Sequence, residues 1–313
     1  MRVIAIVFPG QGSQFMGMLQ AWAQEEPLIQ ATFSQASEKL GYDLWALTQI
    51  GPEEKLNQTE FTQPALLAAG VALYRVLVRH LKTPPSYLAG HSLGEYTALV
   101  CANAIAFDEA IKLVEMRGRF MQRAVPVGKG AMAAIVGLSA QQVESVCAEI
   151  STPQAFVAPA NYNADFQVVI AGDTLAVEKA MTNALTQGAK LAKKLLMSVP
   201  SHCLLMKPAA EQLKKYLENI SIQQPTLPVI HNVDVAVHTT PGAIRTALVE
   251  QLYRPVCWTQ TMKQFTQNGV DTLIECGPGK VLTGLGKRIA DSPQHTFSMS
   301  APEELQKILA EVK

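Results

Sequence analysis

Ser92 is the residue of this sequence best placed to act as a nucleophile. It lies at the centre of Gly90-His91-Ser92-Leu93-Gly94, a G-x-S-x-G pentapeptide. Residues 86–89 before it read as a short strand, and residues 95–100 after it read as a helix. A strand, a sharp turn and a helix make a nucleophile elbow, in which the flanking glycines allow the tight turn. Such an elbow holds the serine hydroxyl at the first turn of the helix, where unpaired N–H groups favour negative charge.

A serine is a weak nucleophile without a positioned base, and His202 is the best candidate for that base. His91 adjoins Ser92 on the elbow, so its side chain is expected to point away. His202 stands in Val199-Pro200-Ser201-His202, where an inserted segment is expected to rejoin the main α/β layer. It could equally serve as a structural cap of the following helix. No acidic residue stands out as its third partner, so a Ser-His dyad and a full triad both remain open.

A glycine loop, Gly10-Gln11-Gly12, follows the first apolar strand. It does not complete the dinucleotide-binding pattern G-x-G-x-x-G, because Phe15 stands where the third glycine is required. The loop has another use beside an elbow, since the second oxyanion donor of such sites comes from a loop after a neighbouring strand. The N–H groups of Gln11 and Leu93 are therefore predicted to form an oxyanion hole.

Arg117 falls on the apolar face of a predicted helix over residues 107–124. The other side of that helix is charged. Because an isolated buried charge is very unfavourable, Arg117 needs an anionic partner. That partner is either a protein carboxylate in a structural salt bridge or a carboxylate of the substrate, held by the guanidinium fork.

The elements that position these residues fall into two groups. Residues 1–125 and 200–313 read as one α/β layer and residues 126–199 as an inserted subdomain. The insert shows the order β-α-β-β-α-β of a ferredoxin-like unit, with a last strand over 190–199. In the layer, strands are expected over 3–8, 229–233 and 270–276, and helices over 29–40, 64–81, 204–218, 242–253, 259–268 and 281–289.

Composition limits the class of protein. A chain of 313 residues can bury a large core, and its formal net charge of zero argues against a broad nucleic-acid surface. The five cysteines are scattered without a C-x-x-C pair, as expected for reduced thiols in the cytosol. The opening apolar run is too short for a signal peptide, and no apolar run approaches the roughly 20 residues that span a bilayer. We therefore expect a cytoplasmic protein with no nucleic-acid or membrane partner.

Five motifs in this order resemble those of the malonyl-CoA:acyl carrier protein transacylase family over essentially the whole chain. They are Phe8-Pro9-Gly10-Gln11-Gly12-Ser13-Gln14, Gly90-His91-Ser92-Leu93-Gly94-Glu95-Tyr96, Val114-Glu115-Met116-Arg117-Gly118, Val199-Pro200-Ser201-His202 and Glu275-Cys276-Gly277-Pro278-Gly279. The resemblance implies an α/β-hydrolase-like large domain with a parallel sheet plus an inserted ferredoxin-like subdomain. It also implies ping-pong transfer of a malonyl group from malonyl-CoA to the phosphopantetheine thiol of acyl carrier protein in fatty acid biosynthesis, with no metal and no cofactor.

The same resemblance assigns roles to seven residues. Ser92 would carry the malonyl ester, His202 would be the base and then the acid, and Arg117 would hold the malonyl carboxylate. Gln11 and Leu93 would supply the oxyanion N–H groups. Gln251 matches the position whose backbone carbonyl orients the histidine, which favours a dyad, and Asn161 lies on a segment that lines the cleft.

Three rival functions remain open from the sequence. A serine esterase could use the same elbow, but it would hydrolyse the acyl-serine rapidly. A module that only docks carrier proteins would not need Ser92, His202 and Arg117. A stand-alone acyltransferase of a polyketide pathway would keep the same chemistry with another carrier.

Overall fold

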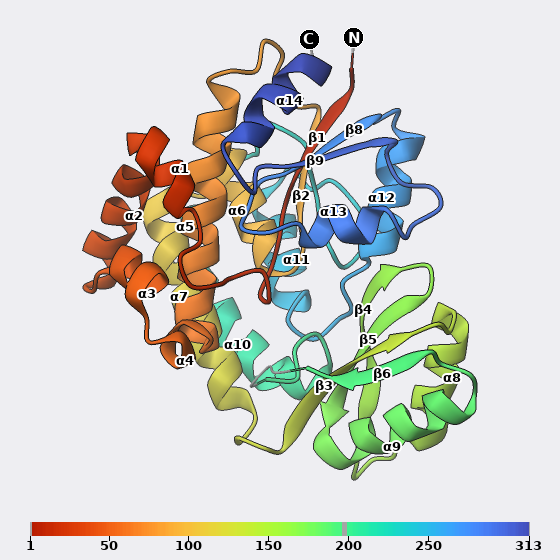
Figure 1. Cartoon of the computed structure of the whole chain (residues 1–313). Helices are drawn as coiled ribbons and strands as arrows, with labels where there is room; N and C mark the ends of the chain where they lie inside the picture. The colour runs from red at the N-terminus through yellow and green to blue at the C-terminus, as the bar shows by residue number, and fades with distance from the viewer. Residues whose placement is uncertain (1, 196–198, 313) are drawn as a thin grey trace.

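The computed structural model describes residues 2–195 and 199–312, and its centre is a five-stranded parallel sheet (Figure 1). The strand order is β7-β2-β1-β8-β9. These strands are β1 Ile4–Phe8, β2 Tyr87–Gly90, β7 Val229–Ile230, β8 Thr272–Glu275 and β9 His295–Ser298. All neighbouring strands run parallel, so their carboxyl ends, and the loops that follow them, lie at one edge of the sheet.

Strand β1 is buried along its whole length because helices cover both faces of the sheet. Its side chains alternate between two cores, as the period of a strand requires. Ile6 and Phe8 pack in the larger core with helices α5 (Thr59–Val78) and α6 (Leu93–Cys101). Val7 packs in a second core with helices α12 (Trp258–Gln267) and α13 (Val281–Gly286). The continuous apolar run of the sequence is explained by this two-sided burial.

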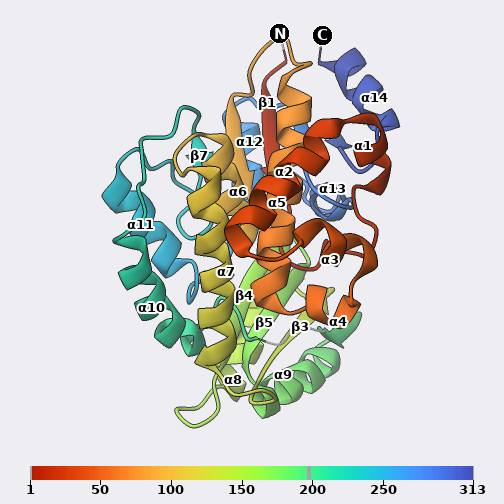
Figure 2. The same cartoon turned by 90° about the vertical axis from the view of Figure 1, so that its left-hand side faces the viewer.

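The helices of this layer lie mainly on the side of the larger core. Figure 2 shows α7 beside α5, with α10 and α11 next along the molecule. The helices are α1 Gln20–Glu25, α2 Pro27–Leu40, α3 Leu44–Ile50, α4 Glu53–Leu56, α5 Thr59–Val78, α6 Leu93–Cys101, α7 Phe107–Ala124, α10 Lys207–Leu217, α11 Pro241–Glu250, α12 Trp258–Gln267, α13 Val281–Gly286 and α14 Glu303–Glu311.

Helix α5 is more apolar than the runs of the sequence suggested. Its most apolar stretch has a mean hydropathy of 1.4, and by length and composition alone it could cross a membrane. However, 78% of that stretch is buried inside the protein, where it packs against α6, α7 and α2. We therefore identify α5 as a core helix of the α/β layer.

A second, antiparallel sheet forms a separate unit with strand order β4-β5-β3-β6. Its elements are β3 Gly130–Val136, α8 Ala140–Ile150, β4 Val157–Ala164, β5 Gln167–Asp173, α9 Thr174–Thr186 and β6 Leu191–Lys194. Both helices pack on one face of this sheet. The chain order β-α-β-β-α-β is the predicted ferredoxin-like unit, so the predicted fold class is confirmed. The boundaries 126–199 stay a prediction, and part of the last predicted strand, 196–198, lies outside the described residues.

The structure also differs from the expected elements at several places. The strand expected over 229–233 ends at Ile230, because His231 and Asn232 turn inward to bond a buried side chain. The helix expected over 204–218 begins with a 3₁₀ turn, Leu204–Met206. Five elements were not predicted, namely α1, α3, α4, β9 and α14. All of them are short, and so they carry few turns of periodic pattern.

Candidate active site

The elbow forms as the motif predicts, with Ser92 between β2 and α6. Ser92 has a φ of 51° and a ψ of −105°, a conformation that a non-glycine residue adopts only under constraint. A Cβ on Gly90 would lie 1.8 Å from the carbonyl carbon of Gly94, and one on Gly94 would lie 1.9 Å from the Phe8 oxygen. Both positions therefore require glycine, because the first turn of α6 passes directly against Gly90 and the end of β1 passes directly against Gly94.

Ser92 and His202, which lie 110 residues apart, are in hydrogen-bond contact. The Ser92 Oγ lies 2.8 Å from His202 Nε2, and His202 Nδ1 lies 2.7 Å from the backbone oxygen of Gln251. Because a carbonyl can only accept, Nδ1 carries the hydrogen and Nε2 presents its lone pair to the serine hydroxyl. No carboxylate forms an ion pair with His202 in residues 2–195 and 199–312. Of the two arrangements left open by the residues alone, this geometry is that of a dyad.

The surroundings of His202 keep its imidazole neutral. Burial and, to a smaller extent, the nearby Arg117 cation lower the pKa of His202 to about 3, although the hydrogen bond to Gln251 acts in the opposite direction. A neutral imidazole next to a serine hydroxyl has the protonation state required of a general base.

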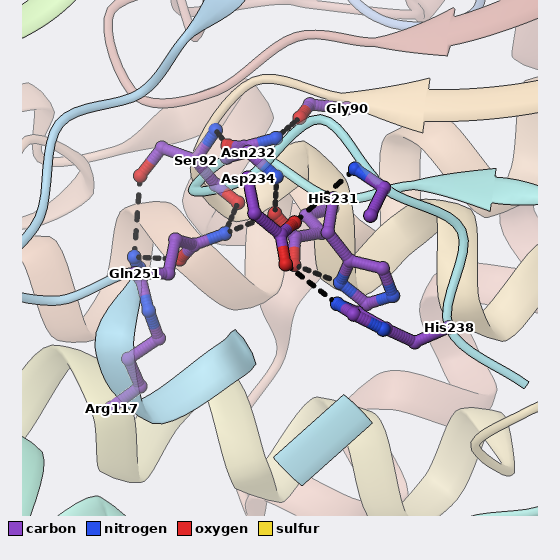
Figure 3. Close-up of polar contacts among 10 residues, drawn as sticks. Gly90, Ser92, Arg117, His231, Asn232, Asp234, His238 and Gln251 are labelled. Atoms are coloured by element: carbon purple, nitrogen blue, oxygen red, sulfur yellow. Dashed lines mark hydrogen bonds and ion pairs between the residues drawn. The ribbon is translucent and has the colours of Figure 1, made fainter. Parts of the chain in front are cut away.

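Arg117 is almost completely buried, 1% exposed, and extends from α7 toward Ser92 (Figure 3). Nη1 donates to Gln63 Oε1 at 2.8 Å. Nη2 donates to Gln251 Oε1 at 2.9 Å and to Ser92 Oγ at 3.2 Å. The guanidinium also lies 5.1 Å from the centroid of the Tyr96 ring.

The contacts of Arg117 within the described chain are all neutral, for it forms no ion pair with Asp or Glu there. Burial lowers the pKa of Arg117, because the charged form is unfavourable away from solvent. The structural salt bridge considered from the sequence is absent from these residues. An anion that entered beside Ser92 would supply the missing partner.

A cavity of about 140 Å³ opens over Ser92 between the two sheets. Its wall includes Gln11 and Leu93, and neither backbone N–H donates a hydrogen bond within residues 2–195 and 199–312. Asn161 on β4 also lines the cavity and is 5% exposed. The structure thus brings together all seven of the site residues predicted from the sequence.

His91 also lines this cavity, contrary to the expectation that it points away from the site. Its Nε2 lies 2.8 Å from Oδ1 of Asn163 on β4, so this nitrogen is hydrogen-bonded to Asn163 and not to Ser92. The ring packs 5.6 Å from that of Trp258. His91 therefore connects the elbow to the smaller sheet and does not replace His202 beside Ser92.

Three further polar residues at the site were missed from the sequence: Gln63, Glu95 and Asn232. Asn232 accepts from the Ser92 N–H through Oδ1 at 2.7 Å and donates to the Gly90 oxygen through Nδ2 at 2.7 Å (Figure 3). Gln63 and Glu95 are buried polar residues on otherwise apolar helices. That break in an apolar pattern is the signal that could have found them.

Comparison with known proteins gives the class first. The family model described as "Acyl transferase domain" matches residues 5–305. The malonyl CoA-acyl carrier protein transacylase of Escherichia coli (strain K12) is 56% identical over 292 residues, covering 93% of this chain and 94% of the relative. That of Haemophilus influenzae is 55% identical and covers 97% of this chain and 99% of the relative.

Solved structures agree with this comparison. The transacylase from Coxiella burnetii superposes with a TM-score of 0.97 at 49% identity, covering 99% of this chain and 98% of that one. A malonyl-transacylase solved in complex with a type II PKS acyl-carrier protein superposes with a TM-score of 0.96 at 51% identity, covering 99% of each chain. The chain belongs to the malonyl CoA-acyl carrier protein transacylase family of acyl transferases.

Proposed function

We propose that this protein transfers a malonyl group from malonyl-CoA to the phosphopantetheine thiol of acyl carrier protein, through an ester on Ser92. We further propose that it works in the cytoplasm and supplies fatty acid biosynthesis. The observation that carries the malonyl assignment is Arg117, a buried cation with only neutral partners in the described chain, 3.2 Å from the Ser92 Oγ. An acyl group that ends in its own carboxylate is the partner that such a cation requires.

In the first half-reaction Ser92 becomes acylated. Its Oγ attacks the thioester carbonyl of malonyl-CoA while its proton passes to His202 Nε2. The Gln11 and Leu93 N–H groups stabilise the oxyanion that forms on the carbonyl oxygen. The carbon–sulfur bond then breaks, and His202 returns the proton to the CoA sulfur as the thiol leaves.

The second half-reaction reverses these steps with another thiol. His202 takes the proton of the phosphopantetheine thiol, and the sulfur attacks the ester carbonyl. The Ser92 oxygen leaves and recovers the proton from His202. A thioester is made for each thioester that is broken, so no net redox change takes place. The hydrogen bond from His202 Nδ1 to Gln251 would hold the ring in the required tautomer through both halves.

The test is intact mass spectrometry of the protein after exposure to malonyl-CoA. We expect one added malonyl group on the wild-type chain and none on Ser92→Ala. The ester should persist without an acceptor and disappear when carrier protein bearing phosphopantetheine is added, with the carrier gaining the malonyl mass. Rapid loss of the ester to water would identify an esterase, and no acylation at all would support a docking module.

Supply of a polyketide carrier is a second candidate. It is favoured by the likeness to the transacylase solved with a type II PKS acyl-carrier protein. Parallel transfer assays with a fatty acid carrier and a polyketide carrier distinguish the two, and we expect higher kcat/KM with the fatty acid carrier.

A further inference from the structure

A buried carboxylate lies behind the elbow, on the first turn of α6. Glu95 is fully buried, with no exposed surface. Its Oε2 accepts hydrogen bonds from the Asn232 N–H at 2.9 Å and from Gln251 Nε2 at 2.8 Å. Its Oε1 lies 2.7 Å from His231 Nδ1. The mechanism described above does not use Glu95, which contacts neither Ser92 Oγ nor the ring of His202 in these described contacts.

His231 also binds this carboxylate. The other ring nitrogen, Nε2, is buried and has no hydrogen-bond partner in the described part of the chain. Because a carboxylate oxygen can only accept, His231 Nδ1 carries the hydrogen of this contact. No Lys or Arg forms an ion pair with Glu95 within residues 2–195 and 199–312. Arg117 lies on the other side of the Gln251 side chain, and the Glu95 carboxylate raises the pKa of Arg117 against the larger, lowering effect of burial.

The side chain of Gln251 connects Glu95 to Arg117, and Figure 3 shows its contact with Arg117. Its Nε2 donates to Glu95 at 2.8 Å and to the Ser92 backbone oxygen at 3.0 Å, and its Oε1 accepts from Arg117 Nη2 at 2.9 Å. A carboxylate can only accept, so Glu95 dictates which end of the amide faces it. The opposite end, the oxygen, must then face Arg117.

Glu95 is also connected to the backbone of the nucleophile, through Asn232. Asn232, whose backbone N–H donates to Glu95, binds both the Ser92 N–H and the Gly90 oxygen through its side chain. The strained backbone of Ser92 is thus held from behind by a residue that the same carboxylate anchors.

We propose that Glu95 is a positioning residue for malonyl selectivity, which fixes the Gln251 amide so that its oxygen holds the Arg117 guanidinium beside Ser92. The proposal rests on the proposed function, because selectivity is defined against malonyl-CoA. Glu95 acts through Gln251 and touches neither the acyl group nor the reacting atoms.

The first test is Glu95→Gln, which keeps the shape of the side chain and removes the charge. Asn232 and Gln251 both donate to the same oxygen of Glu95, so a glutamine there can keep these two hydrogen bonds only as weaker, neutral ones. Its NH₂ group would face His231 Nδ1 in place of an acceptor, and the hold on the Gln251 amide is weakened. We expect kcat/KM for malonyl-CoA acylation to fall by roughly tenfold to a hundredfold, the range of a lost charged hydrogen bond. Acylation by acetyl-CoA, which has no carboxylate, should change much less, so the malonyl/acetyl ratio falls.

Glu115→Gln is the matched control. Glu115 is also a buried carboxylate, 2% exposed, but its partners are Lys112 and Arg119 on α7. The same substitution there should lower thermal stability and leave the malonyl/acetyl ratio unchanged. If the effect were only a general loss of packing around a buried carboxylate, kcat/KM would fall equally for malonyl-CoA and acetyl-CoA in either variant.

Two further variants keep the proposal testable if Glu95→Gln folds poorly. Gln251→Met keeps the backbone carbonyl and the approximate volume but removes the amide, and it should lower the malonyl/acetyl ratio as Glu95→Gln does. In an Arg117→Ala background, Glu95→Gln should change that ratio by less than about twofold, because the residue it positions is gone.

A malonyl/acetyl ratio equal to that of the wild type in Glu95→Gln or Gln251→Met would overturn the proposal. It would also be overturned if Glu95→Gln lowered the malonyl/acetyl ratio in the Arg117→Ala background as much as it does in the wild-type background. Failure of the wild-type chain to accept malonyl from malonyl-CoA would refute the proposed function instead. The two failures are therefore distinguished by the wild-type acylation that each experiment includes.

Discussion

Replacement of Arg117 by alanine should remove most of the preference for malonyl over acetyl. Nη1 of Arg117 has one N–H beyond its bond to Gln63, and Nη2 directs one toward Ser92 Oγ at 3.2 Å. Two charged hydrogen bonds to a carboxylate would contribute about 3–6 kcal/mol, at about 1.5–3 kcal/mol each. That energy corresponds to roughly 10²–10⁴ in kcat/KM. We expect the lower end, since water entering the vacated space would solvate part of the malonyl carboxylate.

The assay is the rate of acyl-serine formation, measured by rapid quench and intact mass with malonyl-CoA and acetyl-CoA separately. The malonyl/acetyl ratio should fall by about 10² or more in Arg117→Ala. Arg123→Ala is the control, because Arg123 lies on the same helix but is exposed to solvent. An unchanged ratio, or an equal loss with both acyl groups, would refute the assignment of Arg117 to the carboxylate.

Two other predictions concern the base and the elbow. Because the pKa of His202 is lowered to about 3, the base stays neutral, so kcat/KM should stay level from about pH 8 to about pH 5. In Arg117→Ala a cation that lowers this pKa is lost, so the acidic limb should move to higher pH; a wild-type profile in that variant would contradict the argument. Gly90→Ala, whose Cβ would meet Gly94 at 1.8 Å, should abolish or severely lower thermal stability. Gly242→Ala meets nothing within 4 Å and should change the free energy of unfolding by no more than about 1 kcal/mol; equal melting temperatures for the two would contradict the steric reason.

The sequence was most informative about the functional residues that come shortly after a strand. Ser92 and Gln11 come directly after β2 and β1, which are paired in the sheet, so local pattern alone predicted that they would meet. Arg117 was identifiable because it interrupts an apolar helix face. The order of elements in the insert was also readable, since its strands and helices alternate with clear turns.

The remaining site depends on contacts that no local pattern encodes. His202 reaches Ser92 through a turn in which its own φ is 62°. Its place after the insert made it a candidate base, but only the family motifs favoured that role over a structural cap. The contacts of Gln251 join Ser92, Glu95 and Arg117 across more than a hundred residues of chain. Whether a buried glutamine uses its backbone or its side chain is decided by tertiary packing, and here it uses both.

Charge balance connects binding of the malonyl group to proton transfer in this site. When Ser92 attacks, His202 gains a proton and becomes a second cation close to Arg117, which already lowers the pKa of His202. A malonyl carboxylate paired with Arg117 offsets the positive charge of Arg117, so proton transfer to His202 becomes more favourable once the malonyl group is bound. An acetyl group brings no carboxylate to offset the repulsion between these two cations. Selectivity should therefore be expressed in the rate of acylation as well as in substrate affinity, because the carboxylate that Arg117 binds also restores the basicity of His202.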